Sequence, residues 1–356
     1  MAWLIVLLII VTILLAAVFI LDKIEFREKG QEDVFRLDDL RQTITYKGET
    51  YARKQDVEAL LVIGVDSYKG AHIDNYNNTD RADFLMLLGI NKKEKSASVL
   101  QINRDTMANV KVLGVRGEPV GYRQEQITLA HTYGSGGEDS AINTVDAVSG
   151  LLYGLDIDHY ISFTMDAVAE YADLVGGIEV ERHFAEDVGL VSGDGWENAE
   201  PDEATGGDSA KSDEITGDGS DKSGSGEFYV LHGAEALQFV RNRDMYSIDA
   251  NIERMERQRH FLSQLKKRTL EKEEEKMELF VLDAIMTVNE FMLSDCTVNQ
   301  LSDYAEILVE NTNNTIMTIE GENTAVSVGD GVSSVQFFAD EDDVKAKMIE
   351  MFFEKE

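Results

Sequence analysis

The stretch ADFLMLLGI at residues 82–90 is apolar except near its start, which is typical of a buried β-strand. The charged segment NKKEK at 91–95 separates it from a second apolar run, SASVLQI at 96–102. That run ends in the polar sequence NRDT at 103–106. Two strands joined by a short turn pair directly, so these residues predict an antiparallel hairpin at the centre of the fold.

The hairpin is expected to bring charged side chains together at its open end. With the turn centred near Lys93, Asp83 falls opposite residue 103 or 104, and Arg104 and Asp105 lie there. Two carboxylates beside an apolar strand are costly unless a cation joins them. The combination predicts a site for a divalent metal ion and a phosphate group.

The bulk composition limits the class of protein. The 356 residues are enough for one large domain or two ordinary ones, and a hydrophobic content of 43% supports a substantial core. Cys296 is the single cysteine, so no intrachain disulfide forms, and we expect it in the core. The net charge of −34 opposes binding to nucleic-acid phosphates, so no nucleic-acid partner is expected.

The first 21 residues predict a transmembrane anchor at 1–21. The run from Ala2 to Leu21 carries no charge, and at about 1.5 Å per residue it spans roughly 30 Å, the thickness of a bilayer core. A cleaved signal peptide is the alternative, but its basic start, shorter apolar run and small-residue cleavage site are not evident. Lys23, Arg27 and Lys29 follow this run. Taken alone, they favour a position inside the cell for the rest of the protein.

The rest of the chain divides into a linker, a folded domain and one insertion. Residues 22–58 are predicted to be a juxtamembrane linker with some helix, and 59–356 a catalytic domain. Residues 191–226 hold ten acidic residues against two lysines and almost no large apolar residue, which predicts a disordered acidic insertion. A calcium-binding loop is the alternative, but the regular ligand pattern with a closing Glu is missing.

Within the domain, strands and helices alternate around the hairpin. Further strands are expected at 59–66, 159–163, 178–181 and 315–319, and a loop at 107–125. Helices are expected at 138–152, from an N-cap at Thr164 to Gly176–Gly177, at 232–243, 250–271, 277–292, from an N-cap at Thr297 to 310, and at 343–353. The pattern predicts an α/β or α+β fold with a central mixed sheet flanked by helices.

A basic segment at 241–268 stands out in this acidic chain. It holds eight Arg or Lys residues against four acids, a local charge of 8 − 4 = +4, which suggests an anionic ligand. Arg254, Arg257 and Gln258 share one side of a helix, and Gln258 falls on its apolar stripe. The alternative is a solvated helix face with ordinary ion pairs. Together with the hairpin acids, the segment favours metal-assisted phosphoryl transfer, in which Mg²⁺ takes carboxylate and phosphate oxygens and arginines neutralise the transferring group.

Several sequence blocks resemble the LytR–CpsA–Psr family of bacterial envelope enzymes. The matching blocks are LVIGVDS at 61–67, RAD at 81–83, INRDT at 102–106, DLVGGIEV at 173–180, LHGAEALQFVRNR at 231–243 and RMERQ at 254–258. The family usually has proline at Asn103 and serine at Ala82, and the block beginning at Ile127 lacks the expected Lys-hydrophobic-Asn start. The arginine expected in the preceding region has two candidates, Arg116 and Arg123, and the sequence does not decide between them.

The resemblance implies a single membrane helix with an extracellular domain that moves a glycopolymer phosphate from a polyprenyl pyrophosphate carrier to a peptidoglycan hydroxyl. It implies Mg²⁺ at Asp83 and Asp105, with Arg104 also catalytic. By the same resemblance, pyrophosphate would bind Arg81, Arg241, Arg243, Arg257 and Gln258. A lipid tunnel would draw on the apolar residues Val145, Val148, Leu152, Leu237 and Val240, for which ordinary core is the alternative. A non-catalytic module binding wall polymers, a lipid pyrophosphate hydrolase and a transcriptional regulator are the competing functions, and the membrane anchor and the acidic charge oppose the last.

Overall fold

The computed structural model describes residues 43–66, 79–114, 116–190, 228–243, 247–272, 277–310, 315–327 and 333–356. The predicted anchor at 1–21, much of the predicted linker and the acidic insertion at 191–226 lie outside these ranges. Among the helices within them, none combines the length and the apolar character needed to cross a bilayer.

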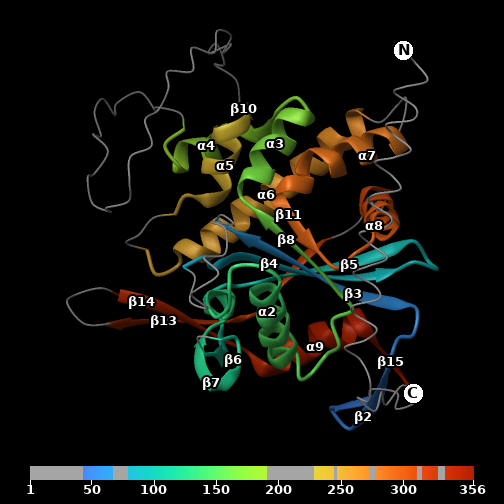
Figure 1. Cartoon of the computed structure of the whole chain (residues 1–356), viewed down its shortest axis with the longest axis vertical. Coiled ribbons are helices and arrows are strands. Elements are labelled where there is room, and N and C mark those ends of the chain that lie inside the picture. The colour runs from blue at the N-terminus through green and yellow to red at the C-terminus, as the bar shows by residue number, and fades with distance from the viewer. Residues whose placement is uncertain are drawn as a thin grey trace. The chain divides into compact units, whose positions relative to one another are not determined.

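The centre of the domain is a six-stranded sheet in the order β11-β8-β3-β4-β5-β12 (Figure 1). The strands are β11 (Met292–Ser294), β8 (His159–Thr164), β3 (Val57–Val65), β4 (Ala82–Asn91), β5 (Ser96–Ile102) and β12 (Ile316–Thr318). The β3–β8 and β5–β12 pairs are parallel and the other neighbouring pairs are antiparallel. The predicted mixed sheet is therefore confirmed.

The β4–β5 hairpin has the predicted register. Its paired residues run from Asn91 opposite Ser96 to Leu85 opposite Ile102, so continuing by two residues places Asp83 opposite Arg104. Successive side chains of β4 alternate between two buried clusters, with Leu87 on one face and Leu88 on the other. Both faces of the sheet are covered, which explains why the strand is apolar along most of its length rather than alternating with polar residues.

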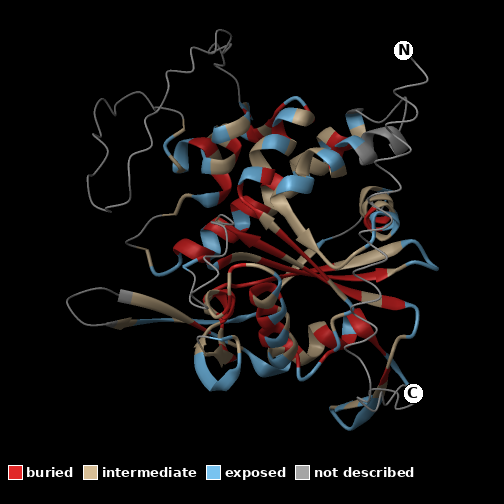
Figure 2. Cartoon of the chain, viewed as in Figure 1, coloured by how far each residue is buried: buried red, intermediate tan, exposed pale blue. Residues whose placement is uncertain are grey.

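Helices form a layer on each face of this sheet. On one side lie α2 (Glu138–Leu151) and α9 (Glu341–Phe352), and on the other α3 (Asp166–Leu174), α6 (Ala250–Lys272), α7 (Met277–Val288) and α8 (Val298–Glu310) (Figure 1). The buried residues concentrate on the sheet and on the helix surfaces that face it (Figure 2). The predicted cap at Thr297 is confirmed, because Thr297 Oγ1 accepts from Gln300 N while Gln300 Oε1 accepts from Thr297 N, at 3.3 and 2.9 Å.

A smaller cluster adjoins α3 and α6. It contains β9 (Ile178–Glu181), α4 (Arg182–Asp187), β10 (Phe228–Leu231) and α5 (Gly233–Arg241). The predicted glycine stop after α3 is confirmed by the positive φ angles of Gly176 and Gly177, 79° and 93°. Strands β9 and β10 pair antiparallel, with Phe228 opposite Glu181, although the insertion separates them in sequence.

Several predicted elements are wrong. The expected loop at 107–125 is a hairpin of β6 (Met107–Leu113) and β7 (Pro119–Gln126), followed by the 3-10 helix η1 (Ile127–Thr132). A further hairpin, β13 (Gly321–Ser327) with β14 (Ser333–Ala339), was not predicted at all. The outer residues of β7 are exposed, so they lack the apolar alternation by which a strand is recognised.

The bounds of other elements also differ from those predicted. Part of the expected linker forms β1 (Thr43–Tyr46) and β2 (Glu49–Arg53), and β2 pairs with the last strand, β15 (Phe353–Lys355), so the fold begins before residue 59. Thr164 ends β8 and does not cap α3, whose N-cap is Met165. The helix expected to reach 292 ends at Val288, and η3 (Asn289–Phe291) and β11 follow it.

Candidate active site

The predicted acid–arginine group lies at one end of the β4–β5 hairpin. Arg104 Nη1 donates to Asp83 Oδ1, and Arg104 Nε lies 3.5 Å from Asp105 Oδ1. All three side chains are largely buried, with exposures of 6% for Arg104, 12% for Asp83 and 4% for Asp105. One guanidinium thus bridges the two carboxylates, as the hairpin register requires.

Two later helices add further positive charge to this group. Burial raises the pKa of Asp105, and the nearby Arg104, Arg243 and Arg254 oppose that rise. Burial lowers the pKa of Arg243, and Arg104 and Arg81 lower it further because like charges repel. Arg81 itself is exposed, so the buried part of the group holds three guanidiniums, those of Arg104, Arg243 and Arg254, against two carboxylates, a net charge of 3 − 2 = +1. Uncompensated buried charge is costly, so the arrangement is suited to an anion that arginine forks can bind.

Arg254 is the site residue that the sequence-based assignment left out. It is 3% exposed, burial lowers its pKa to about 10, and its Nε atom has no hydrogen-bond partner among the described residues. Its Nη2 atom donates to Asn251 Oδ1 at 2.5 Å, and Asn251 Nδ2 donates to Asn103 Oδ1 at 2.6 Å. Asn103 Oδ1 also accepts from the backbone N–H of Asp105, at 2.9 Å. A buried chain of amides therefore connects α6 to the loop at 103–106, which follows β5.

Two of the predicted pyrophosphate ligands are directed to the protein backbone instead. Arg257 Nη2 donates to the carbonyl of Asn242, and its Nε donates to the carbonyl of Phe239 at 3.4 Å. It thereby satisfies the free carbonyls at the end of α5 and fixes the chain just before Arg243. Gln258 Nε2 donates to the carbonyl of Val240 at 3.1 Å. These residues position the arginine segment and do not face Asp83 and Asp105.

The solvated-face alternative for α6 is wrong on this side of the helix. Arg254, Arg257 and Gln258 are at most 6% exposed. By contrast, Arg241 is half-exposed and pairs with Asp66, with 3.2 Å between Nε and Oδ1. Arg116 and Arg123 are both exposed on the β6–β7 segment, where Arg123 pairs with Glu125 at 3.7 Å, so the choice between them stays open.

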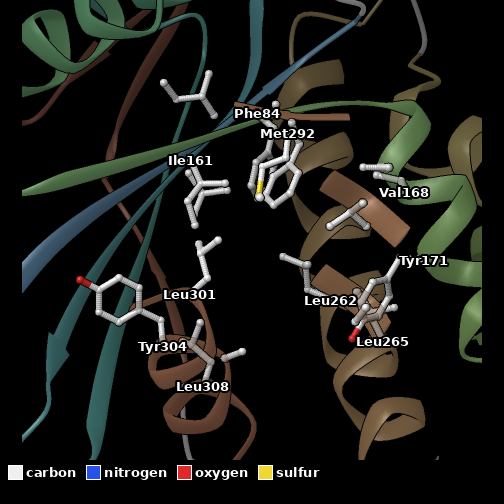
Figure 3. A pocket seen from close by; sticks show the side chains of 18 of the residues that line it. Phe84, Ile161, Val168, Tyr171, Leu262, Leu265, Met292, Leu301, Tyr304 and Leu308 are labelled. Carbon is white, nitrogen blue, oxygen red and sulfur yellow. The ribbon is translucent and has the colours of Figure 1, made fainter. Parts of the chain in front are cut away.

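An apolar cavity of about 370 Å³ lies between the sheet and the layer of α3, α6, α7 and α8. Figure 3 shows Phe84 and Ile161 projecting from the sheet, Leu262 and Leu265 from α6, and Leu301 and Leu308 from α8. The cavity adjoins the charged group along the chain, because Phe84 follows Asp83, Val240 precedes Arg241, and Gln258 lies one turn beyond Arg254.

Gly64 keeps the backbone of β3 close to the aromatic side chains of this cavity. It pairs with Phe84 on one side and Phe163 on the other. A Cβ atom at Gly64 would come within 2.8 Å of Phe84 Cβ and 3.2 Å of Met165 Cε. A larger residue would force these side chains to shift at the cavity wall.

The predicted tunnel residues are mostly wrong. Of the five, Val240 lines the cavity. Val148 and Leu152 lie in the core on the opposite face of the sheet, with Val145 packed against it, and Leu237 is half-buried outside the cavity wall. Ile142, three residues before Val145 in α2, is exposed. An apolar stripe indicates which side of a helix is buried, but not which of the two faces of the sheet it covers.

The donor set at Asp83 and Asp105 fits Mg²⁺. Carboxylate oxygens are ligands that Mg²⁺ prefers, usually one or two of them together with waters and substrate phosphates. Arg104 and Gln126 contact these carboxylates at their Oδ1 atoms, and Asp83 and Asp105 are the residues that would hold Mg²⁺. Because the surrounding charge is positive, the ion is expected to bind together with an anionic phosphate.

A second group of potential ligands, His159, Asp295 and Cys296, has its ligand atoms within 4.8 Å of one another. Gln300 Oε1 accepts from Thr297 N, so Gln300 Nε2 faces His159 Nε2, at 2.7 Å, and donates to it. The proton of a neutral His159 ring is then on Nδ1, toward Asp295 Oδ1 at 3.5 Å. This geometry favours a His–Asp pair over metal ligation.

Comparison with known proteins gives a consistent family and fold. The model described as the LytR_cpsA_psr family matches residues 23–350. The polyisoprenyl-teichoic acid–peptidoglycan teichoic acid transferase TagU of Halalkalibacterium halodurans is 36% identical over 131 residues, 37% of this chain and 36% of that protein. Biofilm regulatory protein A of Streptococcus mutans is 24% identical over 277 residues, 76% of this chain and 58% of that protein. This chain thus matches less than two thirds of the length of either relative.

Two solved structures show the same fold. The crystal structure of Bacillus subtilis TagV has a TM-score of 0.56 at 18% identity, covering 84% of this chain and 96% of that one. TagT bound to LI-WTA has a TM-score of 0.54 at 18% identity, covering 83% and 90%.

Proposed function

The chain belongs to the LytR–CpsA–Psr family, and on that premise we propose that it is a phosphotransferase of the cell envelope. The donor is a glycopolymer, such as a teichoic acid, linked to a polyprenyl pyrophosphate. The acceptor is a sugar hydroxyl of peptidoglycan. The TagU relatives, whose names describe a teichoic acid transfer to peptidoglycan, support this choice of polymer and acceptor.

The observation that carries the proposal is that a cationic group and an apolar cavity are built on the same elements of the fold. Arg104, Arg243 and Arg254 lie around Asp83 and Asp105, and Phe84, Val240 and Gln258 continue from the same elements into the cavity wall. A polyprenyl pyrophosphate has the same two parts, a charged diphosphate joined to an apolar chain. The arrangement supports binding the diphosphate at the arginines with the first isoprene units in the cavity.

In the proposed reaction, the acceptor hydroxyl oxygen forms a bond to the phosphorus that carries the polymer. The bond between that phosphorus and the bridging oxygen breaks, and the lipid leaves as a monophosphate. A carboxylate of Asp83 or Asp105 takes the hydroxyl proton as general base. The arginines stabilise the charge on the transferring group. Mg²⁺, when bound, neutralises the diphosphate oxygens.

The same proposal places the protein at the cell membrane. Residues 1–21 would be the anchor, and the domain would face the outside of the cell, where peptidoglycan lies.

The experiment is a transfer assay with the purified full-length chain, Mg²⁺, a labelled lipid pyrophosphate-linked polymer and peptidoglycan. We expect lipid phosphate release and label in the peptidoglycan, and loss of both with Asp105→Ala. Release that does not depend on peptidoglycan would favour a hydrolase. Binding without turnover, unaffected by loss of either aspartate, would favour a wall-polymer-binding module and contradict the proposal.

A further inference from the structure

We propose that Gln126 is a positioning residue that fixes the Asp105 carboxylate and ties it to the β13–β14 hairpin. The inference rests on the proposed function, because that function gives Asp105 its catalytic role. The tie itself is a property of the fold and can be tested without turnover.

The amide of Gln126 has a single orientation. Its Nε2 atom donates to Asp105 Oδ1 at 2.9 Å and to the carbonyl oxygen of Val335 in β14 at 2.6 Å. A carboxylate and a carbonyl are both acceptors, so only the NH₂ end of the amide, with its two hydrogens, can serve both. Both hydrogens are therefore used, and a flipped amide would place an oxygen against two oxygens.

The backbone around Gln126 holds this side chain in place. Ile127 N donates to Thr106 O at 2.7 Å, and Thr128 N donates to Arg104 O at 3.1 Å. On the other side, Phe337 N donates to Asp105 O at 2.9 Å. The end of β7, the loop at 103–106 and β14 are thus joined by backbone hydrogen bonds, and Gln126 adds a side-chain bridge from them to the Asp105 carboxylate.

The electrostatics of the site explain why a neutral amide is useful there. The groups that act on Asp105 are Arg104 beside it, Arg243 after α5 and Arg254 in α6, while Asp83 from β4 shares Arg104 and Arg81 lies near Arg243. A carboxylate among several cations can turn toward any of them. Gln126 donates to Oδ1, the oxygen that Arg104 Nε also approaches at 3.5 Å, and so fixes this oxygen without adding charge, which leaves the other oxygen to its partner in the reaction.

The test compares Gln126→Leu and Gln126→Glu with Gln124→Leu, a matched control at an exposed glutamine two residues earlier on β7. In the transfer assay we expect Gln126→Leu to lower kcat by about 10- to 100-fold, as is typical when a residue supporting a ligating side chain is lost. The KM for the lipid substrate should change little, because the arginines are untouched. Gln126→Glu should be worse than Gln126→Leu, since it sets a carboxylate against Asp105. Gln124→Leu should behave as wild type.

Hydrogen–deuterium exchange of the unliganded proteins gives a readout independent of turnover. The Phe337 amide should exchange faster in Gln126→Leu than in wild type or Gln124→Leu. Unchanged exchange would overturn the tie, and an unchanged kcat, or a loss confined to KM, would overturn the positioning role. If wild type transfers no polymer, the proposed function fails while the exchange result still decides the tie. If Gln126→Leu does not fold, Gln126→Asn, whose shorter amide cannot bridge both acceptors, takes its place.

Discussion

Replacing Arg254 by methionine is expected to stabilise the unliganded protein and weaken its binding of a diphosphate. Arg254 is 3% exposed, and burial lowers its pKa to about 10, with repulsion from Arg104 as the next cause. The folded-state pKa lies below that of the unfolded chain, so folding disfavours the charged form. The cost is fully present at neutral pH and disappears only as the pH rises above about 10. At about 1.4 kcal/mol per pH unit it amounts to roughly 3 kcal/mol.

The net gain is smaller than this cost. Methionine fills much of the same space, but the variant loses the hydrogen bond to Asn251, worth about 1–2 kcal/mol. We therefore expect the free energy of unfolding to rise by about 1–2 kcal/mol and Tm by roughly 2–6 °C. The control is Arg182→Met on the surface of α4, where the partner is Glu186; its effect should stay within about 0.5 kcal/mol.

Ligand binding is measured by the increase in Tm when geranyl pyrophosphate and Mg²⁺ are added. The ligand raises the free energy of unfolding by RT ln(1 + [L]/Kd), so a higher Kd gives a smaller increase in Tm. Loss of a hydrogen bond to a charged group, worth about 1.5–3 kcal/mol, predicts a Kd roughly 10- to 100-fold higher for Arg254→Met. A lower Tm for the unliganded variant would refute the buried-charge argument. An unchanged Kd would refute the assignment of Arg254 to the diphosphate site.

Three further outcomes follow from the same geometry. Asp83→Asn should lower the transfer rate by at least about 100-fold if this carboxylate acts as base or ligand, and an activity near that of wild type would remove it from the mechanism. Gly64→Ala should weaken binding of geranyl pyrophosphate but not of inorganic pyrophosphate in calorimetry, and should cost about 1–3 kcal/mol in urea unfolding because the new methyl meets Phe84; equal effects on both ligands would contradict the position of the cavity. Asn103→Ala leaves the N–H of Asp105 without its acceptor and should lower the free energy of unfolding by about 1–3 kcal/mol, whereas a change below about 0.5 kcal/mol would show that the amide chain is not needed for stability.

The parts of the site that were predicted correctly depend on local sequence. Asp83 and Arg104 meet because a short turn fixes the register of two apolar strands, and register can be read from the residues themselves. Gln126 and Asn251 were missed because their partners lie in β14 and in the loop after β5, far away in sequence. A polar residue bound to a distant carbonyl looks in sequence like any surface residue.

The errors over the cavity have a related cause. Val148 and Val240 both occupy apolar helix positions, and only the order of the strands decides that one packs against the core and the other lines the cavity. That order includes a parallel pair, β3 with β8, whose connection passes through two hairpins, β4–β5 and β6–β7, and then η1 and α2. Sequence periodicity does not reveal which face such a connection covers.

The pairing of β2 with β15 makes the folded unit a candidate for circular permutation. Phe353 lies opposite Arg53, and Glu356 N donates to Thr50 O at 3.1 Å, so the end of the chain reaches the β1–β2 turn. A short Gly-Ser bridge could join residue 356 to residue 43, with new ends opened between β9 and β10, where the strand pairing would hold both in place. Such a permutant would show whether folding and the proposed activity depend on where the chain ends lie in the domain.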